Sequence, residues 1–202
     1  MSGPRLLLAS ANPGKLRELR AMLDGVEVLS LRDVGIADLE EPFDDFVANA
    51  STKATQASTL SGLPALADDS GLAVDALDGA PGVFSARFSG AHGDDAANRA
   101  LLLERMRDVD DGARGARFRC VLALADVAGA LGPRVLVAQG ACAGAITRAG
   151  RGDGGFGYDP LFVPLGLDRT MAELRPDEKA TLSHRARALR AMRPTLRAYL
   201  GR

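Results

Sequence analysis

The chain has 202 residues, a length that favours a single domain, and its 25 basic residues nearly balance its 26 acidic ones. This near-neutral charge argues against a nucleic acid or an anionic membrane as the main partner, because both usually require a basic excess. No apolar run approaches the roughly 18 residues of a membrane span, and the N-terminal leucine run is too short for a signal-peptide core, so we expect a cytoplasmic protein.

The first part of the chain alternates apolar strands with helical patterns. The predicted strands cover residues 5–10, 26–29 and 63–67, and the predicted helices cover residues 16–23 and 46–58. Asn12-Pro13-Gly14 is a turn signal before the first helix, and residues 33–44 are acidic and irregular. The third strand is expected to end at Asp68-Asp69-Ser70-Gly71.

The second part repeats this mixture, with two glycine-rich loops at residues 79–93 and 150–160. A helix is predicted over residues 95–107, and strands over 118–127, 134–141 and 145–148. The second glycine-rich loop leads into residues 161–164. Ser183 is a suitable N-cap for a last helix, which Pro194 is expected to kink. The pattern predicts an α/β fold with a mixed sheet, formed by one domain over residues 1–202.

The segment Ser10-Ala11-Asn12-Pro13-Gly14-Lys15 connects a predicted strand to a predicted helix. Such a connection offers backbone N–H groups and the positive end of a helix dipole to an anion. It is not a P-loop, because Ala9 stands where the first glycine belongs and Leu16 replaces the serine or threonine. An anion-binding loop and an ordinary strand–turn–helix connection both stay open on this segment alone.

Three glycines between residues 152 and 157 match the G-x-G-x-x-G pattern of dinucleotide-binding folds. The context argues against such a fold, since no strand clearly precedes the pattern and Tyr158-Asp159-Pro160 follows where a helix should open. The same loop carries Phe156 and Tyr158, two of only nine aromatic residues. The loop could wrap a planar base, or one ring could fill the core.

Acidic residues form two clusters with different contexts. Surface solvation is the simpler explanation of the first cluster, which comprises Glu40, Glu41, Asp44 and Asp45. Asp68 and Asp69 instead lie where a buried strand emerges, and paired carboxylates of this kind suit Mg²⁺. The sequence argues against a zinc site with several histidine ligands, since His92 and His184 are its only histidines.

The basic residues comprise twenty-two arginines and three lysines, Lys15, Lys53 and Lys179. A lysine ammonium is a compact point charge that suits phosphate, so these positions are candidates for phosphate binding. Carboxylates, lysines and a glycine loop with aromatic rings together indicate phosphate chemistry on a nucleotide. The two cysteines, Cys120 and Cys142, have apolar neighbours and are predicted to be buried reduced thiols rather than a disulfide.

Several motifs follow one another along nearly the whole chain. In order they are Ser10-x-Asn12-x-x-Lys15, Asn49-Ala50-x-x-Lys53-Ala54, Asp68-Asp69-Ser70-Gly71-Leu72, Gly79-Ala80-Pro81-Gly82-Val83-x-Ser85-Ala86-Arg87, Gly155-Phe156-Gly157-Tyr158-Asp159-Pro160 and Ser183-His184-Arg185. Each motif alone is weak evidence for a family, but the ordered set of motifs is highly specific. The chain resembles the inosine/xanthosine triphosphate pyrophosphatase family.

The resemblance implies a two-lobed α/β fold with a long mixed sheet flanked by helices, a cleft between the lobes, and a homodimer. It also implies Mg²⁺-dependent hydrolysis of ITP, dITP and XTP between the α and β phosphates. The products are the monophosphate and pyrophosphate, so the reaction removes deaminated purines from the nucleotide pool.

The resemblance also assigns roles to the residues at matching positions. The phosphates would be held by Ser10, Ala11, Asn12, Pro13, Gly14, Lys15, Lys53 and Ser70. Glu41 and Asp69 would bind Mg²⁺, and Asp69 would also be the catalytic base for the attacking water. The base would be enclosed and read by Phe156, Gly157, Tyr158, Asp159, Lys179, His184 and Arg185.

Two positions depart from the family, which often has glycine at position 11 and glutamate at position 48. Ala11 could stiffen the first loop, and Ala48 removes a carboxylate from the expected metal shell. Glu40 is an alternative to Glu41 as metal ligand, although the spacing favours Glu41. Two other functions stay open: a related pyrophosphatase of modified pyrimidine or methylated nucleotides, and a nucleotide-binding sensor without turnover.

Overall fold

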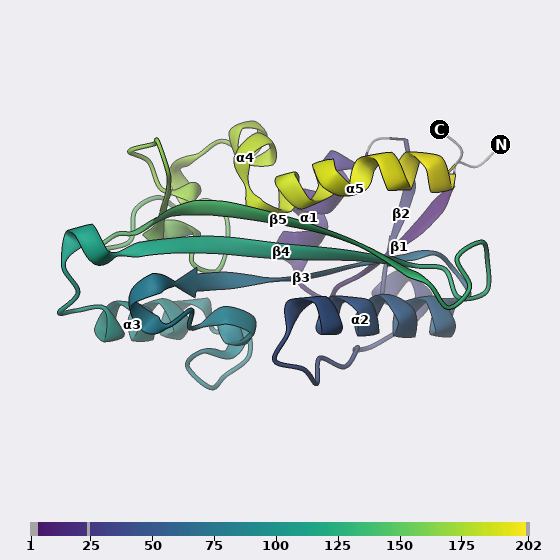
Figure 1. The fold of residues 1–202 in the computed structure, drawn as a ribbon, viewed down its shortest axis with the longest axis horizontal. Coiled ribbons are helices and arrows are strands. Elements are labelled where there is room, and N and C mark those ends of the chain that lie inside the picture. Colours follow the sequence, from purple (N-terminus) through teal and green to yellow (C-terminus); the bar gives the residue numbers. More distant parts are fainter. Residues whose placement is uncertain (1–3, 24, 201–202) are drawn as a thin grey trace. The chain divides into compact units, whose positions relative to one another are not determined.

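The computed structural model describes residues 4–23 and 25–200. Within these residues, six strands form one sheet in the order β2-β1-β3-β4-β5-β6 (Figure 1). The strands are β1 (Arg5–Ala9), β2 (Glu27–Ser30), β3 (Ala65–Val74), β4 (Gly115–Ala125), β5 (Val135–Ile146) and β6 (Phe162–Pro164). β1 runs parallel to β2 and β3, whereas β5 and β6 are antiparallel. The predicted α/β class with a mixed sheet is confirmed.

The described chain divides into two compact units. Unit 1 takes the residues up to Asp69, those from Cys120 to Gly140, and those from Ala188 onward, and unit 2 takes the remainder. The chain therefore passes from unit 1 to unit 2 within β3, between Asp69 and Ser70. Each unit contains its own hydrophobic cluster.

In unit 1, helices cover both faces of the sheet. Leu6 and Leu8 of β1 pack with Leu19 of α1 (Pro13–Met22) and Leu189 of α5 (His184–Leu200). Because side chains alternate along a strand, the buried Leu7 points to the other face. Figure 1 shows α2 (Phe46–Ser61) on the face opposite α5, and α2 buries a stripe of alanines against the sheet.

The helix ends follow local capping rules. The Asp45 carboxylate accepts a hydrogen bond from the Ala48 amide at 2.8 Å and caps α2. Gly62 ends α2 with a φ of +66°, a left-handed conformation that glycine adopts without strain. The Ser183 hydroxyl accepts a hydrogen bond from the Ala186 amide at 3.2 Å, so the predicted cap of α5 is confirmed.

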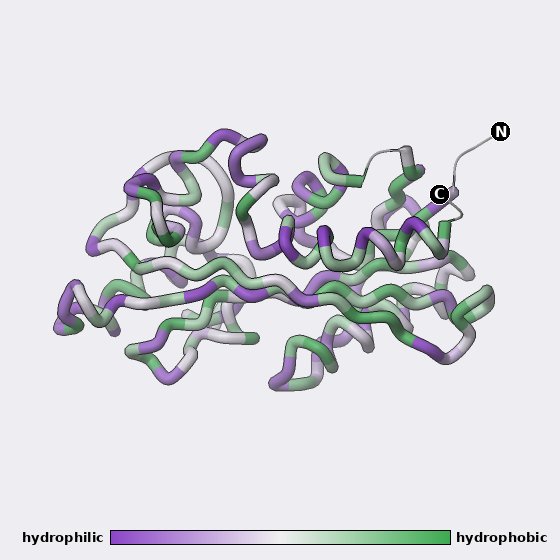
Figure 2. The backbone as a smooth tube through the Cα atoms, turned by 45° about the horizontal axis from the view of Figure 1, so that its top comes forward, coloured by the Kyte–Doolittle hydropathy of each residue, from purple (hydrophilic) through white to green (hydrophobic). Residues whose placement is uncertain are grey.

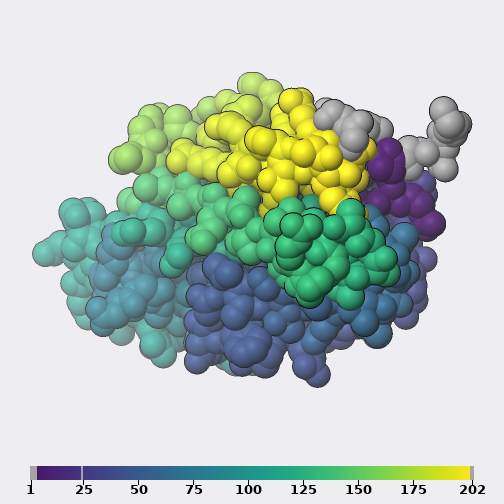
Figure 3. Space-filling view, turned by 45° about the vertical axis from the view of Figure 1, so that its right-hand side comes forward, coloured from purple at the N-terminus to yellow at the C-terminus, as the bar shows by residue number. Residues whose placement is uncertain are grey.

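α5 is amphipathic, and Figure 2 shows hydrophobic and hydrophilic residues alternating along it. Its last turns are tied to the turn between β4 and β5, because the Tyr199 hydroxyl donates to the Asp126 carboxylate. Figure 3 shows α5 in yellow beside this turn in green. Pro194 lies inside the helix, and the kink expected there stays a prediction.

In unit 2, the core contains Leu72, Leu102, Phe118 and Tyr158. Leu102 belongs to α3 (Asp95–Arg105), and α4 (Pro176–Leu182) precedes α5. Among residues 4–23 and 25–200, we find no helix with the length and apolarity needed to cross a membrane. Cys120 and Cys142 are buried and form no disulfide, as predicted.

Some predicted elements differ from those in the structure. β3 continues through Asp68-Asp69-Ser70-Gly71 to Val74, although its register with β1 ends at Ala67. Its other neighbour in the sheet is β4, and lysines neutralise Asp68 and Asp69. Residues 135–146 form one strand, β5, where two were predicted. The sequence prediction also missed α4, which begins with Pro176 at its first position.

Candidate active site

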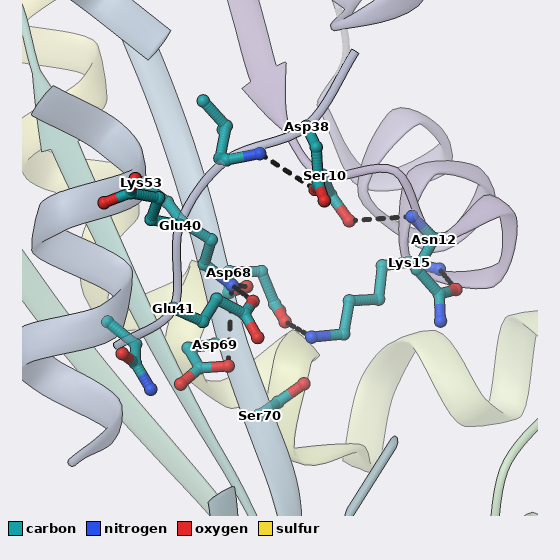
Figure 4. A network of polar contacts seen from close by, with 12 residues as sticks. Ser10, Asn12, Lys15, Asp38, Glu40, Glu41, Lys53, Asp68, Asp69 and Ser70 are labelled. Atoms are coloured by element: carbon teal, nitrogen blue, oxygen red, sulfur yellow. Dashed lines mark hydrogen bonds and ion pairs between the residues drawn. The ribbon is translucent and has the colours of Figure 1, made fainter. Parts of the chain in front are cut away.

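β3 carries two adjacent buried carboxylates in unit 1. Asp68 is 1% exposed and Asp69 is 5% exposed. Because successive strand side chains point to opposite faces, each aspartate meets a different helix. Lys15 of α1 reaches Asp68, and Lys53 of α2 reaches Asp69 (Figure 4).

Asp68 holds the Lys15 ammonium in place. Lys15 Nζ lies 2.7 Å from Asp68 Oδ1, and the Cys120 thiol donates to Asp68 Oδ2 at 3.1 Å. Lys15 belongs to the first turn of α1, where Asn12 Oδ1 accepts from the amides of Gly14 and Lys15 at 2.8 and 3.1 Å. The Asn12 side chain therefore already engages these two amides, and anion binding by this segment stays a prediction.

Lys53 connects the other carboxylates. Its ammonium donates to the Glu41 carboxylate, to the Asp68 backbone carbonyl at 2.9 Å and to Asp69 Oδ1 at 3.5 Å. Burial lowers the pKa of Lys53, but Asp69 and Glu41 outweigh this effect, so the pKa stands above its usual value. Glu40 is exposed, and its amide donates to Gln56 Oε1 at 3.0 Å. Of the two glutamates, Glu41 is the one that reaches Lys53.

These five residues, Lys15, Glu41, Lys53, Asp68 and Asp69, form what we call the carboxylate–lysine cluster. It holds three acidic and two basic side chains, which leaves an excess of negative charge when all are ionised. Asp69 Oδ2 is buried and has no hydrogen-bond partner among the described residues. Burial raises the pKa of Asp69, and the nearby lysines lower it only in part.

An uncompensated buried carboxylate oxygen fits a hard divalent cation. Across the described parts of the chain, no three His, Cys, Asp or Glu side chains gather in a way that could hold a metal. A cation here would therefore complete its shell with water and phosphate oxygens, as ions that keep much of their hydration do.

The buried ion pair of Asp68 makes a testable contribution to stability. We expect Asp68→Asn to lower the free energy of unfolding by about 1–3 kcal/mol, because a hydrogen-bonded buried charge is lost. A matched control is Asp111→Asn, which breaks a 2.7 Å pair with Arg148 between side chains that are 79% and 55% exposed. That change should cost less than about 1 kcal/mol. Urea unfolding of both variants measures the difference, and equal losses would contradict the structural role of Asp68.

A loop of unit 2, Gly155–Asp159, presents the aromatic residues; we call it the aromatic loop. Asp159 is 3% exposed, accepts from the Phe156 amide at 2.8 Å and pairs with Lys179 Nζ at 2.5 Å. A Cβ at Gly155, whose φ is +74°, would lie 2.1 Å from Asp159 Oδ2. Glycine is therefore required for the loop to close over this carboxylate.

The two rings of the aromatic loop have different surroundings. The Tyr158 ring is buried in the core of unit 2, and its hydroxyl donates to the Ser85 carbonyl at 3.0 Å. Burial, and then Asp95, raise the pKa of Tyr158, so its phenol stays neutral. The Phe156 ring is only half-buried, with Lys179 Nζ 5.0 Å and Arg185 Cζ 5.7 Å from its centroid. Of these two rings, Phe156 is the one that can meet a ligand.

The first turn of α5 contributes two buried side chains to unit 2, the His184 ring and the Arg185 guanidinium. Arg185 is 1% exposed and donates from Nη2 to the Ser70 hydroxyl at 3.0 Å. The His184 ring stacks on Phe118 with centroids 4.7 Å apart. Ser183 caps the helix that carries both residues, so their backbone positions are fixed.

The predicted site residues thus fall into two groups. Unit 1 brings Lys15, Lys53, Glu41 and Asp69 together, with Ser10, Ala11, Asn12, Pro13 and Gly14 at the start of α1. Unit 2 joins Phe156, Gly157, Tyr158, Asp159 and Lys179 through the aromatic loop, and Ser70, His184 and Arg185 through the start of α5. The sequence prediction missed the contacts of Asp68 with Lys15 and Cys120, since residues far apart in sequence make them.

Comparison with known proteins decides the family. The sequence pattern of the Ham1 family matches residues 6–195. The chain belongs to the Ham1 family. A relative from Nocardia farcinica, named dITP/XTP pyrophosphatase, is 50% identical over 209 residues, covering 100% of this chain and 99% of the relative. A Pseudomonas aeruginosa protein of the same name is 53% identical over 193 residues, covering 95% and 96%.

A solved Ham1 structure agrees with the fold. The HAM1 protein from Coxiella burnetii superposes with a TM-score of 0.85 at 42% identity, covering 96% of this chain and 98% of that one. The resemblance inferred from the ordered motifs is therefore confirmed. The glycine pattern at residues 152–157 is followed by a short 3₁₀ turn, Asp159–Leu161, where a dinucleotide-binding motif would open a helix.

Proposed function

We propose that this Ham1 chain is a nucleoside triphosphate pyrophosphatase that hydrolyses non-canonical purine nucleotides, with ITP, dITP and XTP as substrates. The main support from the structure is the carboxylate–lysine cluster at β3, where two adjacent carboxylates each meet a lysine. The names of relatives at 50% and 53% identity support the same activity. The products would be the nucleoside monophosphate and pyrophosphate.

The cluster would bind and position the triphosphate. Lys15 and Lys53 supply positive charge, with Ser70 and the Ser10–Gly14 segment as further phosphate-binding residues. Phosphoryl chemistry depends mainly on such positioning and charge neutralisation. Asp69 is the catalytic base in this proposal, since its Oδ2 is buried and accepts no hydrogen bond from a described residue, which leaves it able to take a proton from water.

Glu41 and Asp69 would hold the divalent cation, which we propose to be Mg²⁺. When bound, Mg²⁺ supplies charge neutralisation of the triphosphate and increases the acidity of water. Ala48 offers no carboxylate, so the protein contributes two carboxylates at most from the predicted positions. This small number suits Mg²⁺, which usually takes one or two protein carboxylates.

Unit 2 would bind the base. Phe156 would stack on the purine between the cations of Lys179 and Arg185. Gly157, Tyr158, Asp159 and His184 would shape this surface. Arg185 is a donor that cannot lose its proton, so it suits the oxygen at purine C6 of hypoxanthine and xanthine rather than the amino group of adenine. We further propose that residues 1–202 act as one two-lobed domain and form a homodimer in the cytoplasm.

A substrate panel tests the proposed activity. With Mg²⁺, we expect ITP, dITP and XTP to be hydrolysed at least about 100-fold faster than ATP, because a site that pairs with one polar group rejects its mismatched analogue. Pyrophosphate release is measured for each nucleotide, with a chelator as the metal-free control. Orthophosphate as the product, or ATP turned over as fast as ITP, would refute the proposal.

The same panel separates the alternatives. Faster turnover of modified pyrimidine or methylated nucleotides would favour a related pyrophosphatase. Nucleotide recovered intact after incubation with Mg²⁺ would favour a sensor.

A further inference from the structure

α3 holds the aromatic loop through both peptide groups of Gly157. The Gly157 amide donates to Asp95 Oδ2 at 2.7 Å, and Arg99 Nη1 donates to the Gly157 carbonyl at 2.8 Å. Asp95 and Arg99 are one helical turn apart, so they lie on the same face of α3. Both side chains are half-buried, and neither belongs to the predicted substrate-binding set.

These contacts fix the backbone on both sides of one residue. The Gly157 amide lies in the peptide plane shared with Phe156, and its carbonyl lies in the plane shared with Tyr158. Because each plane is rigid, holding both groups leaves little freedom for the Gly157 dihedrals. Its φ is +59°, a left-handed conformation that glycine adopts readily. The position of the Phe156 ring therefore depends on α3.

The rest of the loop is held from other sides. Asp159 accepts from the Phe156 amide, and the Tyr158 hydroxyl donates to the Ser85 carbonyl. α3 also holds the segment that follows Ser85, because Asn98 accepts from the Ser89 amide at 2.7 Å. Phe156 is thus presented by a loop whose neighbouring backbone groups are fixed, although its ring is half-buried.

We propose that Asp95 and Arg99 are positioning residues for base recognition, acting through Gly157 to hold Phe156 in place for the purine. This inference rests on the proposed function, in which Phe156 stacks on the base. Hydrogen bonds to charged groups are roughly twice as strong as neutral ones, which suits a loop that must stay in one conformation. Selectivity between purines then depends on α3 as well as on residues facing the base.

The test compares Asp95→Ala and Arg99→Met with a control on the same helix, Glu104→Ala, whose side chain is exposed. We use "clamp" for the two hydrogen bonds that Asp95 and Arg99 make to Gly157. Hydrogen exchange at the Gly157 amide reports on this clamp directly. Calorimetric titration with IMP and AMP measures base recognition without turnover. We expect both variants to lose protection of the Gly157 amide. A displaced Phe156 would also lose its contact with Arg185, the proposed donor to the oxygen at purine C6. The Kd for IMP should therefore rise about 10-fold, while the Kd for AMP, which lacks that oxygen, changes less.

Conservative changes separate positioning from a general role in folding. Asp95→Asn keeps an acceptor oxygen, so it should retain most of the IMP affinity that Asp95→Ala loses. In the double variant Asp95→Ala/Arg99→Met, the Kd for IMP should rise by less than the product of the two single increases, because both residues hold the same glycine. Glu104→Ala should match the unmodified protein in every measurement.

Three results would overturn the positioning role. They are unchanged Gly157 protection in both variants, equal shifts of the IMP and AMP affinities, and an unmodified protein that binds IMP no better than AMP. A protein that binds IMP selectively and responds to the variants, yet releases no pyrophosphate from ITP, would instead refute only the proposed hydrolysis.

Discussion

Asp69→Asn is expected to remove pyrophosphate release from ITP almost completely with only a small change in the stability of the folded state. The change preserves the shape of the side chain and removes its negative charge. Loss of a general base alone lowers a rate by about 10²–10⁴-fold, and the same change removes a proposed cation ligand. We therefore expect kcat to fall by at least about 10³-fold.

The stability half of this prediction follows from the burial of the carboxylate. Asp69 is 5% exposed, and its Oδ2 has no hydrogen-bond partner in the described residues. Its pKa is raised by burial, so the stability that this group provides is present at low pH and is lost as the pH rises through its folded-state pKa. Asparagine avoids the cost of burying the ionised carboxylate, but it also removes the negative charge that most supports the buried Lys53 ammonium, so the two effects offset each other in part.

Neighbouring aspartates should consequently respond to the same substitution to different extents. Asp68 accepts on both oxygens, from a lysine and a thiol, whereas Asp69 has one 3.5 Å contact with Lys53 and one oxygen without a hydrogen-bond partner in the described residues. Asp68→Asn should therefore cost more stability than Asp69→Asn. Urea unfolding in the presence of a chelator measures both, and kcat with ITP and Mg²⁺ measures the activity. An Asp69→Asn protein that turns over ITP normally would show that this carboxylate is not the base.

Most of the fold was accessible from the sequence because periodicity and capping signals are local. The strand at residues 5–9, the helix after Asp45 and the cap at Ser183 each depend on residues within a few positions of one another. α4 carried such a signal too, with Pro176 followed by two acidic residues at the helix start, although the sequence prediction missed it.

The errors arose where tertiary contacts override local patterns. Asp68-Asp69-Ser70-Gly71 has the composition of a loop, yet it lies inside β3, where lysines from two helices neutralise the aspartates. Gly71 has a packing role that spacing could not reveal: a Cβ there would lie 2.2 Å from the Gly82 carbonyl oxygen. The strand can approach this neighbouring backbone only because position 71 has no side chain.

The sequence predicted which residue types belong to the candidate site better than it predicted which residues contact one another there. All three lysines of the chain form ion pairs with carboxylates that are mostly or partly buried, and their role in phosphate binding stays a prediction. Which carboxylate each lysine meets depends on the sheet and could not be read from the sequence. The clamp on Gly157 joins residues 58 and 62 positions apart, and no local pattern marks it.

The second large effect is expected for Lys53→Arg, although it conserves charge. Lys53 is 5% exposed, and its ammonium lies among the Glu41 carboxylate, the Asp68 carbonyl and Asp69. A guanidinium is larger and planar, and its donors point in fixed directions that do not match three acceptors around one nitrogen. Accommodating it would move Glu41 or Asp69 from its position.

A displacement of about 1 Å at reacting groups can lower a rate by about 100-fold, so we expect kcat/KM for ITP to fall by at least that factor. Crowding the buried site should also lower the free energy of unfolding by about 1–3 kcal/mol. The matched control is Lys15→Arg, whose side chain is 15% exposed and has room to adjust around one carboxylate, Asp68. Its loss of activity should be clearly smaller. If Lys53→Arg were as active as the unmodified enzyme, the position would need only a positive charge, and the scarcity of lysine in this chain would have no functional meaning at residue 53.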